Sequence, residues 1–334
     1  MSASPDTCGK IESHKGRDIL KRLVLGPSVF PHQCTVGLRA PQSEISAWLD
    51  TGTGTLRDVT SSNLIAGTQP LVIGIGTDSG EVQSVVDAKR PVLRFREQNA
   101  NQRTLGKISL EQIDTLSVGT AQLHLFRALG SANYCLPKAR QWARYFYHGC
   151  QRWRSGTRST VSGLRISQRE LRCLYAFYIC PRPVALVSVM DRGAGNIFPM
   201  DLSGSFADDH FALALHADSG PAPLLESSRK IALSDIPMEQ VQLAYALGKN
   251  HNRKSVDCGR MAFATIPSPS YQLPVPEFSV RVREMQIESV RNMGSHKLFL
   301  ARVIADHRSS NGLQPHFIHG FYQTWRQQFH APQG

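Results

Sequence analysis

The polar side chains best placed to bind a ligand lie between Arg182 and Gly220. An apolar run from Val184 to Val189 leads into a turn at 191–196, and a later apolar run ends in a polar loop at 216–220. The two glycines of the turn can adopt positive φ and so reverse the chain. Three strands, two reversals and a loop of small polar residues are suited to lining a ligand groove.

The usual catalytic motifs are missing from the sequence. It contains no phosphate-binding G-x-x-x-x-G-K-[ST], no zinc-binding H-E-x-x-H and no G-x-S-x-G. Gly74-Ile75-Gly76 lacks a third glycine in register, which disfavours a dinucleotide-binding fold. Carboxylates are scattered, which disfavours a hydrolase with paired acids. His316 and His319 lie in a strand-like segment, and no metal site is predicted.

The composition indicates a globular protein with an anionic partner. Hydrophobic residues make up 41% of the 334 residues, and the formal charge of +12 suits phosphorylated cofactors, nucleotides or nucleic acid, among which charge alone does not choose. The seven cysteines show no C-x-x-C pair, which favours reduced thiols. No apolar run is long enough for a membrane span, and the N-terminus lacks a signal-like core, so we expect a cytoplasmic protein.

The elements that must position the polar loop occur twice along the chain. Residues 71–93 and 211–233 share a strand, the tripeptide Asp-Ser-Gly, a short helical segment, a basic pair and a second strand. Residues 119–129 likewise parallel 294–304, in the same order. This collinearity predicts an internal duplication, with chance resemblance as the alternative. We expect a polar arm at 1–25, a degenerate domain at 26–154, a linker at 155–170 and a second domain at 171–334.

Two further elements are expected in the second copy. Asp235 is placed to cap a helix in which Met238, Val241 and Tyr245 share a buried face, and Gly248 is a suitable terminator. The segment 278–283 alternates with period two, so we expect its arginines to point outward.

Several motifs of the second copy resemble the flavin reductase-like, FMN-binding split-barrel family. They are the run R-P-V-A-L-V from Arg182, the N-x-x-P of Asn196 and Pro199, and G-S-H-K-L-F from Gly294. The resemblance covers about residues 171–326. It implies a mainly β fold with short helices, a six-stranded antiparallel barrel, and assembly as a homodimer with flavin between subunits. Together with the duplication, it predicts tandem split barrels that form an intramolecular pseudo-dimer.

The resemblance also implies residue roles. Residues 196–203 would run along the flavin ring, the loop at 216–219 would approach the phosphate, and His296 would act catalytically beside the ring or the nicotinamide. Asp218 in that loop departs from the family pattern, because a carboxylate repels phosphate, and Arg229 and Lys230 would compensate. The expected cofactor-binding residues are Asn196, Pro199, Met200, Asp201, Leu202, Ser203, His216, Ser219, Arg229 and Lys230.

The resemblance implies an NAD(P)H-dependent oxidoreductase that transfers hydride to FMN or FAD. Ala121 stands where the second copy has His296, so we expect the first copy to be mainly architectural. The alternative is a barrel pair that has lost flavin and binds or transforms another small molecule in a biosynthetic pathway. That alternative is motivated by the aspartates at 78 and 218. A haem-binding split barrel and a nucleic-acid-binding protein remain as further readings.

Overall fold

The computed structural model describes residues 33–39, 44–52, 56–77, 90–99, 101–119, 121–156 and 167–329. The expected N-terminal arm, most of the expected linker and the first Asp-Ser-Gly loop lie outside these residues. Within them the fold is mainly β with short helices, as predicted. No helix in this part of the chain is long and apolar enough to cross a membrane.

The first half of the chain forms a seven-stranded antiparallel sheet. Its strands lie in the order β3-β2-β6-β7-β8-β5-β4. Their bounds are β2 Ile45–Asp50, β3 Leu56–Asp58, β4 Asn63–Thr68, β5 Leu71–Thr77, β6 Val92–Glu97, β7 Thr104–Val118 and β8 Ala121–Asn133.

The second half forms another seven-stranded antiparallel sheet, in the order β11-β10-β14-β17-β18-β13-β12. Its strands are β10 Ala185–Asp191, β11 Ala194–Met200, β12 Ser203–Ala207, β13 His210–His216, β14 Lys230–Asp235, β17 Arg281–Met293 and β18 His296–Arg308. The helix α5, Ala222–Ser228, joins β13 to β14, and a separate two-stranded ribbon pairs β15 Thr265–Pro267 with β16 Pro274–Pro276.

The two sheets have the same topology. When the strands of each half are numbered in chain order, both sheets read 2-1-5-6-7-4-3. This agreement confirms the predicted tandem of two like β units in one chain. The split-barrel prediction holds, but the sheet has seven strands in place of the expected six and does not close. Its outer strands β11 and β12 are joined by the chain between Met200 and Ser203 without pairing to each other.

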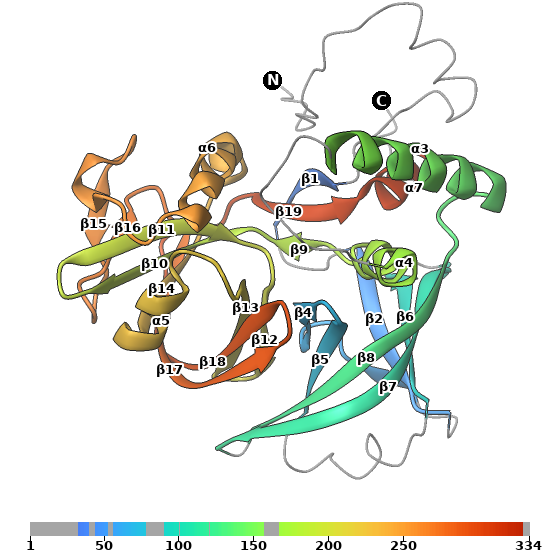
Figure 1. Ribbon diagram of the computed structural model, residues 1–334, viewed down its shortest axis with the longest axis horizontal. Helices are drawn as coiled ribbons and strands as arrows, with labels where there is room; N and C mark the ends of the chain where they lie inside the picture. Colours follow the sequence, from blue (N-terminus) through green and yellow to red (C-terminus); the bar gives the residue numbers. More distant parts are fainter. Residues whose placement is uncertain are drawn as a thin grey trace, which may run out of the picture.

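Segments from the ends of the second half complete the first half. The helix α4, Gln168–Phe177, packs on β7 and β8 of the first sheet (Figure 1). The strand β19, Gln314–His319, lies between β1, Gln33–Leu38, and β9, Arg182–Pro183. It leads into α7, Gly320–Phe329, which lies beside α3, Lys138–Gly156 (Figure 1). Phe177, Ile318 and Phe321 are therefore in the core of the first half.

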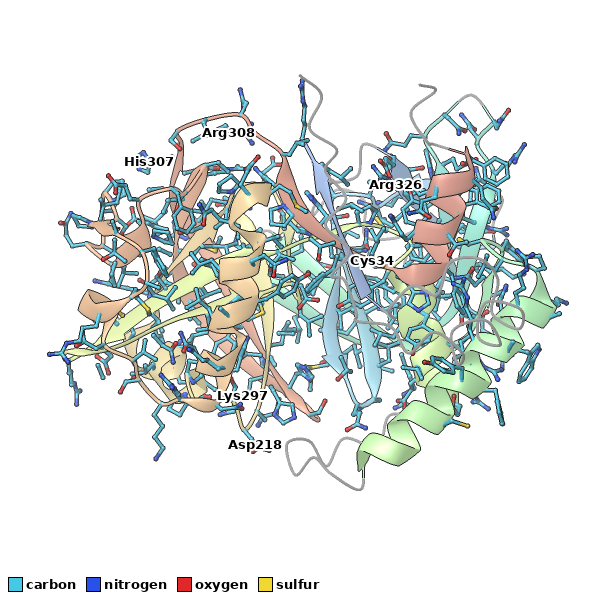
Figure 2. The ribbon with its side chains drawn as sticks, turned by 90° about the horizontal axis from the view of Figure 1, so that it is seen from above. Cys34, Asp218, Lys297, His307, Arg308 and Arg326 are labelled. Carbon is cyan, nitrogen blue, oxygen red and sulfur yellow. The ribbon has the colours of Figure 1, made fainter. Side chains whose placement is uncertain are left out.

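The halves meet in a buried apolar contact that we call the joint. It is formed where β4, β5 and β8 of the first sheet face β12, β13 and β18 of the second. Leu64 and Leu123 pack there against Phe206 and Leu298, all at most 1% exposed. Figure 2 shows Cys34 of β1 between the halves, with Arg326 of α7 over the first half and Asp218 and Lys297 at one edge of the second. The joint is the pseudo-dimer interface that the resemblance implies.

Local predictions had mixed outcomes. The turn between β10 and β11 is confirmed, since Arg192 and Gly193 both have positive φ. Asp235 is not a helix cap: it ends β14 and forms an ion pair with Arg283. Gly248 does end α6, Val241–Leu247. Tyr245 was expected in the core but is 44% exposed.

Candidate functional site

The outer edge of β11 is covered by the chain that follows β14. Here η1, Met238–Gln240, and α6 lead to η2, Gly248–Asn252, and to η3, Cys258–Arg260. The Nδ2 group of Asn250 donates to the carbonyl of Ile197 at 2.8 Å, and the backbone N–H of Val256 donates to the carbonyl of Gly195 at 2.8 Å. The carbonyl groups of this edge are therefore already paired.

Residues of the predicted strip from Asn196 to Ser203 also form hydrogen bonds with the segment that covers β11. Asn196 is fully buried, and its Nδ2 donates to the carbonyls of Asn250 at 3.2 Å and Arg253 at 2.9 Å. The carbonyl of Pro199 accepts from His251 Nε2 at 2.8 Å, which fixes the proton on Nε2. Burial lowers the pKa of His251, so this imidazole is neutral at physiological pH.

The predicted phosphate loop also contacts η2. Ser219 Oγ donates to the carbonyl of His251 at 3.1 Å, and the N–H of Gly220 donates to the same carbonyl at 2.7 Å. A Cβ on Gly220 would lie 2.3 Å from the carbonyl oxygen of Arg253, so only glycine allows this approach. The structure thus brings Asn196, Pro199 and Ser219 together around residues 250–253 of the same chain.

His216 and His296 meet at the joint. They are opposite each other on β13 and β18, and their ring centroids are 5.5 Å apart. His296 is 6% exposed, and its Nδ1 lies 2.8 Å from Ser295 Oγ. The first half covers His296, since Gln69 donates its N–H to the neighbouring Ser295 Oγ at 3.1 Å, whereas His216 is partly exposed. Burial and the neighbouring His216 lower the pKa of His296 to about 4, so it is neutral at physiological pH.

The remaining predicted residues fall into three settings. Met200 is in the second core, and Leu202 packs where the apolar clusters meet. Asp201 accepts a 2.7 Å hydrogen bond from the hydroxyl of Tyr178, and burial raises the pKa of this carboxyl. Arg229 and Lys230 are both exposed; Arg229 donates to the carbonyl of Glu288, and the Lys230 ammonium lies 5.1 Å from the centre of the Tyr271 ring. These two cations therefore have partners other than Asp218.

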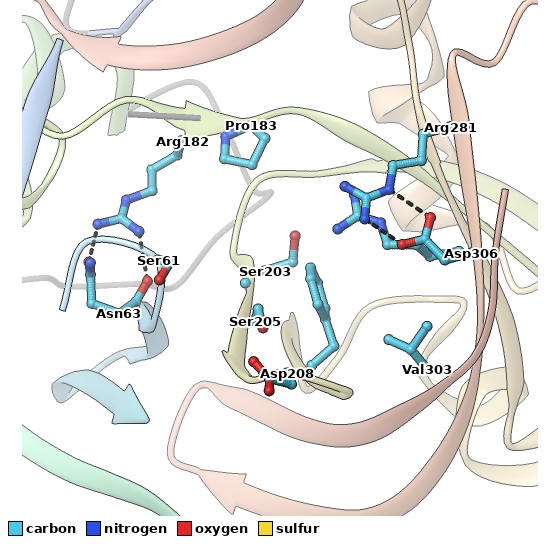
Figure 3. Close-up of a pocket in the computed structure, with 13 residues that line it drawn as sticks. Ser61, Asn63, Arg182, Pro183, Ser203, Ser205, Asp208, Arg281, Val303 and Asp306 are labelled. Atoms are coloured by element: carbon cyan, nitrogen blue, oxygen red, sulfur yellow. Dashed lines mark hydrogen bonds and ion pairs between the residues drawn. The ribbon is translucent and has the colours of Figure 1, made fainter. Parts of the chain in front are cut away.

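A cavity of about 250 Å³ opens between the halves at the other end of β4 (Figure 3). Ser203 is the predicted site residue that lines it, together with Gly204 and Ser205 of β12. The first half contributes Ser61 and Asn63. Asn63 begins β4, whereas Thr68, at its end, lies 3.5 Å from His296 Nδ1. Five steps along a strand are about 17 Å, so the cavity and His296 are separate places.

Three arginines line the cavity, and sequence reasoning had assigned a role to none of them there. Arg281 pairs with Asp306, its Nε donating at 2.7 Å, and Arg283 pairs with Asp235. Arg283 was expected to point outward, but its side chain is 14% exposed because it faces the carboxylate on the neighbouring strand β14. Arg182 donates from Nη1 to the carbonyl of Asn63 at 2.8 Å and from Nη2 to the Asn63 side chain. For Arg281 and Arg283, the alternating pattern of residues 278–283 was the only signal in the sequence.

The flavin that the resemblance implies can be tested against these contacts. A flavin would need donors and acceptors from the strip and the loop, but Asn196, Pro199 and Ser219 already bond to residues 250–253. In this arrangement the strip does not present those groups to a flavin. In the part of the chain that the structure describes, no cluster of three or more histidine, cysteine, aspartate or glutamate side chains is placed to hold a metal ion.

Comparisons with known proteins identify the second half. Residues 177–326 match the model of the flavin reductase like domain. No curated protein matches the sequence significantly. Solved structures that resemble the chain include an FMN-binding protein from Thermus thermophilus, at 25% identity over 40% of this chain and 75% of that chain, with a TM-score of 0.36.

Two further solved structures are flavin reductases by description. The NADH:FAD oxidoreductase of Streptomyces globisporus is 16% identical over 48% of this chain and 95% of its own, with a TM-score of 0.41. The styrene monooxygenase flavin reductase of Pseudomonas putida S12 is 17% identical over 44% of this chain and 91% of its own, with a TM-score of 0.36. The family match covers residues 177–326, which is less than half of the chain, and it concerns the second half alone.

Proposed function

We propose that the protein is a flavin-dependent oxidoreductase of the flavin reductase type, which passes hydride from NAD(P)H to FMN or FAD. The observation that carries the proposal is that the family domain at 177–326 contains the strip, the loop and His296 together. A bound flavin would supply the redox chemistry, while the chain supplies position and field. This division of labour needs no catalytic carboxylate pair.

The chain's own residues define what flavin binding requires. Because residues 250–253 hold the polar groups of the strip, binding there would displace η2 from β11. The His296 imidazole is neutral, and its Nδ1 is hydrogen-bonded to Ser295 Oγ. It would therefore act on a bound flavin or nicotinamide through its position and not as a cation. The first half covers His296, so a nicotinamide would reach this imidazole only if the joint opened there.

The test uses the purified full-length protein. A flavin spectrum in the near-ultraviolet and blue, or quenching of added FMN or FAD fluorescence together with NADH or NADPH oxidation, supports the proposal. A colourless protein that quenches neither flavin and oxidises neither nicotinamide with added flavin contradicts it.

A second candidate is a split-barrel pair that binds or transforms another small molecule without flavin. It is favoured by the occupied strip, in which Asn196 Nδ2 and the Pro199 carbonyl already bond to Asn250, His251 and Arg253. Denaturing the purified protein and identifying what it releases distinguishes the two: an isoalloxazine supports the first candidate, and a different small molecule supports the second.

The domain division, a duplicated origin and a cytoplasmic location remain predictions. The identical strand order of the two sheets supports duplication. The elements α4, β19 and α7 belong to the second half of the sequence but pack against the first half. This packing supports two structural units, with the first unit built from more than one stretch of the chain.

A further inference from the structure

The cavity at the joint is lined by a buried cation that has no directly paired carboxylate among the described residues. Arg182 is 4% exposed, and among the described residues it forms no ion pair. Its neutral partner Asn63 satisfies two of its nitrogens, and the face of Phe177 lies 4.0 Å from the guanidinium carbon. The Asp201 carboxylate attracts Arg182 but forms no ion pair with it. A buried charge without a direct partner is costly, so this arrangement favours an anion beside Arg182.

Two buried donors beside the cavity lack a protein acceptor, and a ligand would meet them after a small shift of the side chains that cover them. Nε of Arg182 is buried and has no hydrogen-bond partner among the residues the structure describes, and the same holds for Nε of Arg283 across the cavity. Each of the two guanidinium groups thus offers an N–H directed at no protein acceptor. Hydrogen bonds from a cation to an anionic acceptor are about twice as strong as neutral ones.

The charges around the cavity limit the ligand to a single negative charge. Arg281 is matched by Asp306, and Arg283 by Asp235, which leaves Arg182 as the unmatched cation. Asp208 also lines the cavity, but it is exposed, at the end of β12 (Figure 3). A dianion such as phosphate would exceed the positive charge available, whereas a carboxylate would match it.

Part of the lining is apolar. Pro183, Phe211 and Val303 line the same cavity. At about 250 Å³ it is smaller than sites that enclose drug-sized ligands, which are about 300–1,000 Å³. The ligand that fits combines one carboxylate with a compact ring or a short hydrocarbon body.

We propose that the cavity between the halves binds a small organic carboxylate, with Arg182, held by Asn63 of the first half, as the residue that receives its charge. The proposal goes beyond the flavin reductase function and does not depend on it. It gives the first half a direct part in ligand binding, whereas the sequence predicted a mainly architectural role.

The experiment measures binding to the full-length protein by calorimetry, with benzoate as the probe. Benzamide, its neutral isostere, and inorganic phosphate are the comparison ligands. We expect benzoate to bind at least about tenfold more tightly than either, since benzamide carries no negative charge for the Arg182 guanidinium and phosphate carries excess charge. Equal affinity for benzamide, tighter binding of phosphate, or no benzoate binding by the folded protein would overturn the proposal.

Two kinds of variant locate the site. Val303→Phe fills the cavity and leaves Arg182 in place, so benzoate binding should be lost. Ile304→Phe, on the other face of the same strand, is 43% exposed and should bind like the natural protein. Arg182→Gln should also abolish binding, provided circular dichroism shows a folded protein. Binding that survives Val303→Phe, or that saturating FMN abolishes in the natural protein, would place the carboxylate elsewhere and refute the proposal.

Discussion

The hydroxyl of Tyr178, at the end of α4, donates a 2.7 Å hydrogen bond to the carboxylate of Asp201, in the connection from β11 to β12. This bond joins a helix that packs on the first sheet to the predicted flavin strip of the second. The bond lowers the pKa of Asp201 against the larger opposing effect of burial, which raises it.

Tyr178→Phe should leave the Asp201 carboxylate buried without this donor. We expect a loss of about 1–3 kcal/mol in the free energy of unfolding, because a buried polar group loses its partner. Urea denaturation measures it. Asp201→Asn in the Tyr178→Phe background should recover part of the loss; a double mutant no more stable than Tyr178→Phe would contradict the explanation.

Gly294 should tolerate no side chain. Its φ is +74°, and a Cβ would lie 2.2 Å from the carbonyl oxygen of Gln69 in the first half. Gly193 is the matched control, since its φ is +83° but nothing lies within 4 Å of the added atom. Gly193→Ala should cost about 1 kcal/mol for backbone strain alone. Gly294→Ala should cost clearly more in the same urea titration, because it also pushes the halves apart; equal costs would mean that this contact is absent.

His296 should make the protein less stable in acid. Its pKa falls from 6.5 to about 4 on folding, chiefly by burial, so the unfolded chain binds an extra proton between these values. The contribution of neutral His296 to the free energy of unfolding is therefore fully present above about pH 6.5. It declines as pH falls toward about 4, by about 3 kcal/mol in total. Denaturation midpoints across this range should show the decline.

The matched variant for this pH effect is His296→Asn, which does not titrate in the range. Its stability should change less with pH than that of the natural protein. If both proteins lose the same stability between neutral and acidic pH, the effect belongs to other groups.

Asn196→Ala separates an anchoring role from a flavin-binding role. Two hydrogen bonds from Asn196 hold η2 against β11, so we expect the variant to lose about 1–3 kcal/mol of stability without any flavin present. Hydrogen exchange at residues 248–253 should also become faster. A variant with unchanged stability and exchange but weaker flavin binding would support direct flavin contact and contradict anchoring.

The sequence predicted elements that depend on local signals. Gly193 marked the turn between β10 and β11, and the repeated spacing indicated two like units; both features depend on neighbouring residues or on order along the chain. Asp235 was misplaced because the cap signal Asp-x-Pro is equally compatible with the end of a strand, and the ion pair to Arg283 on the neighbouring strand decided the outcome.

The site was less accessible to prediction. The pairing of Arg182 with Asn63 joins residues 119 positions apart, and neither residue type signals the other. The coverage of β11 by residues 250–256 likewise arises from the packing of one irregular segment, which has no periodic pattern to read. Motifs located the strip, the loop and His296, while their partners required the three-dimensional arrangement.

The position of β19 has a consequence for cooperativity. This last strand pairs on one side with β1, the first strand described, and on the other with β9, where the second half begins. Removal of the second half would leave the first core without Phe177, Ile318 and Phe321, and removal of the first half would leave β19 with an open strand edge in place of β1. The two halves are therefore inseparable in folding: the chain should melt in one transition, and neither half should be obtained as a stable fragment.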